Sequence, residues 1–151
     1  EVASALDRSV LCWLATSSPD GWPNVSPKEV FAVFDDRHLV IANIASPISV
    51  RNLIKNPKVC VSMVDIFVQK GFKLSGLARN IAREQPEFEQ WVQPLEVMTR
   101  GRFAIKSVIV MEVLECEAIV APSYRYFPNE VSEQSQREAA MRSYGVKPAL
   151  E

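Results

Sequence analysis

Six short apolar runs, separated by turn signals, dominate the sequence between residues 10 and 121. The runs alternate polar and apolar residues or are continuously apolar, and they are rich in β-branched and aromatic residues, as strands are. They cover residues 10–16, 24–34, 39–43, 58–67, 71–82 and 104–121. Turn signals such as Pro-Asp-Gly at 19–21 join several of them as hairpins. We therefore predict a mainly β fold, a six-stranded antiparallel sheet curled into a small barrel with short helices.

Two further segments favour helices. Residues 86–98 place Phe88, Trp91, Val92 and Leu95 on one side, and Pro94 is expected to kink or end that helix. The polar stretch 130–144 is helix-permissive, and Gly145 would end it. The length of 151 residues fits one domain over 1–151, with a peripheral, partly helical tail from about residue 122.

Composition argues against several classes of function. The net charge of −1 and pI near 6.0 give no reason to expect binding to nucleic acid or to a membrane surface. No apolar run approaches the roughly 20 residues of a membrane span, and no leader pattern opens the chain. Cys12, Cys60 and Cys116 lie in apolar runs without metal-ligand spacing, so we expect reduced core residues, no metal site and a cytoplasmic protein.

A short helix is predicted where the strand 39–43 ends. Ser46 suits the N-cap, Pro47 the first helical position, and Asn56-Pro57 ends the helix. The N-terminus of a helix binds anions through its free amides and dipole, and Ser49 adds a hydroxyl donor in the first turn. Arg51 adds a guanidinium one turn further on. Capping alone would also explain Ser46, and the spacing of Arg51 also fits a solvated helix-surface residue.

A second cation is predicted to converge on this helix. Pro27 cannot donate a ladder hydrogen bond, so its strand is expected at an edge or a bulge, where Lys28 is re-aimed. Ser26 and Lys28 share one face of that strand by parity. Two serines, a lysine, an arginine and a helix start suit one phosphomonoester.

Aromatic and acidic side chains elsewhere have simpler interpretations. Trp13 and Trp91 are expected in the core, and His38 in a solvated turn. The aromatic residues of 124–127 fit either substrate entry or dimer packing. Glu115 and Glu117 are expected on a solvated strand face. No residue is assigned as catalytic.

Five motifs in one order resemble the pyridoxamine 5′-phosphate oxidase-related flavin-binding family. They are the hairpin "LATSSPDGWP", "SPK" on the returning strand, the strand exit "ANIASP", the helix end "NLIKNP" and the strand "KGFKLSGLA". They cover roughly residues 8 to 82. The resemblance implies an FMN-binding split β-barrel, with FMN at the subunit interface of a homodimer.

The resemblance also implies roles for individual residues. Ser26 and Lys28 would face the FMN phosphate and ribityl chain. Ile44, Ala45 and Ser46 would run along the isoalloxazine ring. Ser49, Arg51 and Asn52 lie on the helix that holds the phosphate. Gln69 and Lys70 would approach the pyrimidine edge of the ring, where Lys70 would tune its redox chemistry.

Two departures from the family pattern bear on activity. The authentic oxidases carry arginine and lysine directly after the serine that corresponds to Ser46, where this chain has Pro47 and Ile48. They also end in a basic, histidine-containing segment, whereas residues 132–151 hold no histidine. We therefore predict an FMN-dependent oxidoreductase acting on a small molecule other than pyridoxamine phosphate. The alternatives are a flavin-binding carrier or sensor without turnover, and a relative that holds haem or a deazaflavin.

Overall fold

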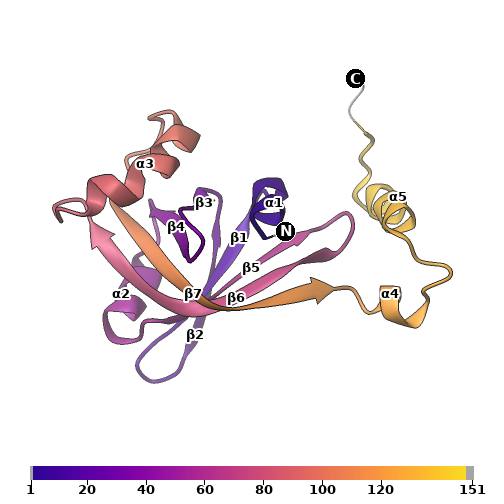
Figure 1. Ribbon diagram of the computed structural model, residues 1–151, viewed down its shortest axis with the longest axis horizontal. Coiled ribbons are helices and arrows are strands. Elements are labelled where there is room, and N and C mark those ends of the chain that lie inside the picture. Colours follow the sequence, from indigo (N-terminus) through magenta and orange to yellow (C-terminus); the bar gives the residue numbers. More distant parts are fainter. Residues whose placement is uncertain (1, 149–151) are drawn as a thin grey trace.

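Seven antiparallel strands form a single sheet in the computed structural model, which describes residues 2–148 (Figure 1). The strands are β1 (Cys12–Ser17), β2 (Pro23–Lys28), β3 (Phe31–Val33), β4 (His38–Asn43), β5 (Lys58–Asp65), β6 (Lys70–Ala82) and β7 (Ser107–Val120). Their order in the sheet is β2-β1-β5-β6-β7-β4-β3. The helices are α1 (Val2–Arg8), α2 (Pro47–Lys55), α3 (Phe88–Thr99), α4 (Ser123–Tyr126) and α5 (Glu133–Tyr144). The mainly β prediction is confirmed.

The predicted strand count of six is wrong, because the run 24–34 makes two strands. The chain leaves β2 at Lys28, bends through Glu29 and Val30, and enters β3 at Phe31. β2 and β3 lie at opposite edges of the sheet, yet only two residues separate them along the chain. The two edges must therefore approach each other at this bend. This requirement curls the sheet into a half-barrel.

Long β6 and β7 extend beyond the barrel. They pair along their whole lengths, with a bulge between Ser75 and Gly76, and their far ends join the β5–β6 hairpin (Figure 1). The first half of β7, 107–111, is buried, whereas Glu115 and Glu117 in its second half are solvent-exposed as predicted. α4 and α5 follow at this extended end, away from α2 and α3.

Two apolar layers meet at β4. Leu39, Val40, Ile41 and Ala42 are all buried, because one face of β4 points into the barrel and the other faces α3. α3 continues through Pro94 to Thr99, so the helix does not end there, which was one of the two predicted outcomes. Its buried residues lie on both sides of the proline, and their packing outweighs one missing backbone hydrogen bond.

The helix signals at residues 46–57 and 145 are confirmed. Ser46 is the N-cap of α2, Pro47 is its first residue, and Asn56 is its C-cap. α5 ends at Gly145, whose φ of 66° is the left-handed conformation that favours glycine. Short α1 and α4 were not predicted, since seven and four residues give too little periodicity to detect.

The cysteines and tryptophans differ from one another in solvent exposure. Cys12 and Trp91 are buried as predicted, but Trp13 is 47% exposed, Cys60 is half-buried and Cys116 is exposed. The sequence prediction failed for these three because an apolar run does not reveal which face of a strand is covered. Among residues 2–148, no helix is long and apolar enough to cross a membrane.

Candidate functional site

A cleft of about 450 Å³ lies between the end of β2 and the exit of β4. It brings together five of the ten predicted site residues: Ser26, Lys28, Ile44, Ala45 and Ser46. Leu11 and Phe103 also line it and were not predicted. Their positions depend on the loops before β1 and after α3, and no local sequence pattern predicts the conformation of these loops.

Strand parity orients the polar side chains of β2. Asn24, Ser26 and Lys28 alternate with the exposed Pro23, Val25 and Pro27. β2 is an edge strand, as the proline at 27 predicted, and Lys28 lies opposite the buried Cys12 of β1. Lys28 therefore points toward the inner side of the sheet, where water is scarce.

Lys28 is a buried cation without an acidic partner. The residue is 5% exposed, and its Nζ donates a hydrogen bond to Ser46 Oγ. None of the ion pairs within the described residues includes it. Burial lowers the pKa of Lys28, while burial raises the pKa of the neighbouring Cys12 thiol to about 12. Glu29 also lines the cleft but forms no ion pair with Lys28 among the described residues, so the buried ammonium has no carboxylate in contact with it.

Ser46, the N-cap of α2, lines the same cleft. Ser46 does not cap the helix with its side chain. Instead its hydroxyl accepts from Lys28, and its backbone N–H donates to Asn43 Oδ1 at 3.1 Å. The first-turn amides of α2 thus keep their capacity to bind an external acceptor, and the helix dipole adds partial positive charge there. A lysine beside a helix start is an arrangement that favours the binding of an anion.

A buried hydrogen-bond network fixes α2 against β1 and β2. Thr16 Oγ1 accepts from Asn24 Nδ2 at 3.1 Å and from Asn52 Nδ2 at 3.0 Å. Asn24 Nδ2 also lies 3.4 Å from Ser49 Oγ. Ser49 and Asn52 are buried behind the cleft, so their side chains position the helix. Arg51 is exposed on α2 and does not line the cleft.

Thr16→Val should loosen this network. Valine has a similar shape but cannot accept a hydrogen bond, so the buried Asn52 amide loses a partner at a cost of about 1–2 kcal/mol. Chemical denaturation should show this loss, and Asn52→Leu on the Thr16→Val background should recover part of it. A variant as stable as the parent protein would contradict the importance of the network.

Gln69 and Lys70 lie elsewhere in the protomer. They belong to the β5–β6 hairpin, and β1 and β5 separate β6 from β2 in the sheet order. Gln69 is exposed, with a positive φ of 55°. Lys70 Nζ donates to Glu133 Oε1 at 2.8 Å and lies 4.5 Å from the ring centre of Tyr124. The protomer does not bring these two residues to the Lys28 cleft.

His38 is held more firmly than a solvated turn residue. Its Nδ1 lies 2.9 Å from Asp35 Oδ1, and its ring centre is 5.4 Å from that of Trp91. Asp35 also accepts the backbone N–H groups of Arg37 and His38. His38 does not line the Lys28 cleft, and this arrangement organises the turn before β4.

Comparisons with known proteins agree with this architecture. The sequence profile of the family described as pyridoxamine 5′-phosphate oxidase matches residues 1–119. A comparison with curated proteins gives no match. The structure of HupZ from Group A Streptococcus is 20% identical, with a TM-score of 0.69 over 80% of this chain and 92% of that chain.

Two further solved structures share the fold. An FMN-binding protein from Syntrophomonas wolfei is 16% identical, with a TM-score of 0.64 over 78% of this chain and 82% of that chain. An F420 reductase is 22% identical, with a TM-score of 0.58 over 76% of this chain and 94% of that chain. At these identities the likeness concerns the fold.

Proposed function

The chain belongs to the pyridoxamine 5′-phosphate oxidase family, and from this premise we propose that it binds FMN with the phosphate in the Lys28 cleft. The observation that carries the proposal is the contact of Lys28 Nζ with Ser46 Oγ, the N-cap of α2. A phosphate there would accept from the lysine and from first-turn amides, and would bring a negative charge into contact with the ammonium. Ser26 lies on the same face of β2 to contact the ribityl chain.

The proposal places the remaining predicted residues either at the Lys28 cleft or on a second subunit. Ile44 and Ala45 line the cleft where the flavin ring would leave it, and Arg51 would contact the phosphate only if its exposed side chain swings toward Ser46. Gln69 and Lys70 would reach the ring edge from the second subunit of a homodimer. The outer face of β1 and β2 supports such a dimer, since Trp13 and Val25 there are 47% and 57% exposed.

We further propose that the FMN-bound protein is an oxidoreductase with a small-molecule substrate. The flavin supplies the redox chemistry, while this chain holds the phosphate, orients the ring and excludes water from the cleft. A flavin carrier or sensor without turnover is the alternative. Reduction of the bound flavin by NADH or NADPH, followed by reoxidation by an added acceptor, would favour the enzyme. A dimer that holds FMN but is never reduced would favour the carrier.

Titration with FMN tests the binding proposal. Flavin fluorescence should be quenched with a stoichiometry of one FMN per protomer, and the absorbance spectrum of the complex should keep the bands of oxidised flavin. The same titration with coenzyme F420 tests the deazaflavin alternative, to which the F420 reductase structure draws attention. Preference for F420 over FMN, or no binding of either, would contradict the proposal.

FMN affinity should fall as pH rises above neutrality. Burial lowers the pKa of Lys28 in the FMN-free protein, and an adjacent phosphate would raise it in the complex. Between these two pKa values, binding must take up a proton, so affinity decreases as pH rises through the pKa of the free protein. Titrations from about pH 6.5, above the phosphate pKa near 6, to about pH 10 should show the decrease. A flat profile would exclude Lys28 as the titrating group.

A further inference from the structure

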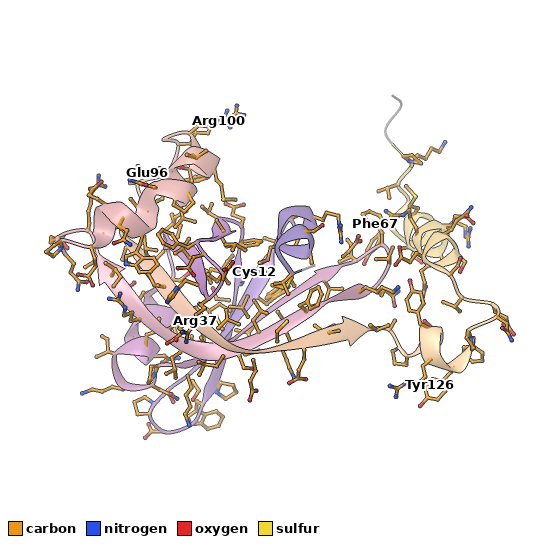
Figure 2. All side chains as sticks on the ribbon, viewed as in Figure 1. Cys12, Arg37, Phe67, Glu96, Arg100 and Tyr126 are labelled. Carbon is orange, nitrogen blue, oxygen red and sulfur yellow. The ribbon has the colours of Figure 1, made fainter. Side chains whose placement is uncertain are left out.

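A second cavity, with a volume of about 730 Å³, lies outside the Lys28 cleft. This volume is within the range of small-molecule sites. α1, the β5–β6 turn, the far ends of β6 and β7, and α5 surround it. Figure 1 shows the hairpin extending between α1 and α5, and Figure 2 shows Phe67 on its turn beside α5. The cavity shares no lining residue with the Lys28 cleft.

The floor of this cavity is apolar. Phe72 lies opposite Ala118, and Gly71 opposite Ile119, on the paired strands β6 and β7. Val68 of the hairpin turn is buried and completes the floor. A flat hydrocarbon or aromatic group fits such a surface.

The rim of the cavity is charged, and part of that charge is already neutralised. Lys70 Nζ and Glu133 Oε1 are 2.8 Å apart. Asp65 Oδ1 accepts the backbone N–H groups of Phe67 at 2.9 Å and Val68 at 3.4 Å, so this oxygen shapes the turn, while the carboxylate keeps its negative charge at the rim.

Two guanidinium groups at the rim remain without a carboxylate partner among the described ion pairs. Arg8 comes from α1 and donates to Ser4 Oγ at 2.8 Å, and Arg137 comes from α5. The pKa of Glu133 is lowered mainly by its hydrogen bond from Lys70, with smaller contributions from Arg137 and Arg8. Both guanidinium groups therefore lie near the same part of the rim.

We propose that this cavity is a second ligand site, for a small amphipathic organic anion. The apolar part of the ligand lies on β6 and β7, and its carboxylate or phosphate binds Arg8 and Arg137. Guanidinium groups suit this role because they stay charged and bind oxyanions through two parallel hydrogen bonds. The site requires no flavin in the Lys28 cleft of the same chain, although Lys70 at its rim is the residue proposed above to reach the flavin of a second subunit.

Occupancy of the site would fix α5 against α1. α5 is a polar helix in which only Ala140 is buried among the described residues, and Tyr144 packs against Phe67 with ring centres 6.2 Å apart. Lys70 and Glu133 form the ion pair between its first turn and β6, and such exposed pairs contribute little. A ligand that joins Arg8 to Arg137 would therefore slow the opening of α5.

Two probes that share a phenylbutyl group distinguish the contribution of the negative charge to binding from that of the apolar group. 4-Phenylbutyrate carries a carboxylate, and 4-phenyl-1-butanol does not. In ¹⁵N-labelled protein, with and without saturating FMN, the carboxylate should shift the amide resonances of 4–8, 65–72 and 133–137. It should also slow amide hydrogen exchange in α5, and the alcohol should bind more weakly.

Arg8→Gln/Arg137→Gln is the critical variant, and Arg125→Gln/Arg142→Gln is its control with the same change in net charge. Arg125 and Arg142 do not line the cavity. Arg8→Gln/Arg137→Gln should lower the affinity for 4-phenylbutyrate at least about fivefold. The control variant should bind this probe with the affinity of the parent protein. The proposal would be overturned if the two double variants bound 4-phenylbutyrate with equal affinity. Equal binding of 4-phenyl-1-butanol and 4-phenylbutyrate, or resonance shifts confined to other regions, would also overturn it. Lys28 variants leave this result unchanged, so failure here is distinct from failure of FMN binding.

Discussion

Lys28→Met is expected to weaken FMN binding roughly ten- to a hundredfold, which corresponds to about 1.5–3 kcal/mol for a lost charge-assisted phosphate contact. Methionine retains most of the length of the side chain, so the cleft keeps its shape while the cation is removed. Fluorescence titration measures the change. Lys55→Met is the control, because Lys55 is exposed in the last turn of α2, away from the helix start. Equal FMN affinity in the two variants would remove Lys28 from the phosphate site.

The same variant should stabilise the FMN-free protein. The pKa of Lys28 lies below its ordinary value of 10.5 in the folded state because burial disfavours the ammonium. The unfolded chain therefore binds this proton more readily, and the destabilising effect of Lys28 grows as pH falls below 10.5 until it is complete below the folded-state pKa. Lys28→Met should accordingly have a higher melting temperature than the parent at neutral pH, and this difference should shrink as pH rises past 10.5.

A lower melting temperature of Lys28→Met at neutral pH would contradict this account of the buried cation. The hydrogen bond to Ser46 would then outweigh the cost of burying the charge. A variant with weaker FMN binding and higher stability is characteristic of a residue that serves ligand binding at a cost in stability.

Local signals in the sequence were sufficient for most of the elements. Pro-Asp-Gly defined the β1–β2 turn, where the N–H of Gly21 donates to the carbonyl of Ser18 at 2.9 Å. Ser46 and Pro47 defined the start of α2. The split of 24–34 into β2 and β3 was not predictable, because it depends on which strands each half pairs with. α3 continues through Pro94 for a similar reason, since distant core residues hold it.

The candidate site was predictable where one strand or one turn sets its geometry. Parity placed Ser26 and Lys28 on one face, and the same rule applied to Asn24 would have suggested the network with Thr16. Lys28 and Ser46, which are 18 residues apart, join β2 to the start of α2. The re-aiming of Lys28 beside Pro27 predicted this contact, and the resemblance to a family suggested the same convergence. The separation of Lys70 from Lys28 is a property of the whole sheet.

Gly76→Ala should destabilise the protein by roughly 3 kcal/mol or more, because overpacking at this point acts on backbone as well as side chains. A Cβ at Gly76 would lie 2.0 Å from the carbonyl oxygen of Glu112 and 3.2 Å from the Cε of Met111. Gly76 stands at the bulge where β6 and β7 change register, so the carbonyl cannot retreat without breaking the ladder that joins the barrel to its extension. Urea denaturation followed by circular dichroism measures the loss.

Gly21→Ala separates this steric effect from the general cost of replacing glycine. No atom lies within 4 Å of a Cβ at Gly21, so its positive φ of 83° leaves backbone strain as the only penalty, about 1 kcal/mol. Gly76 has no positive φ, and its cost comes from the steric contacts with Glu112 and Met111. Gly76→Ala should therefore be much less stable than Gly21→Ala. The opposite order would mean that β6 and β7 can separate at the bulge, and that the extension carrying α5 moves independently of the barrel.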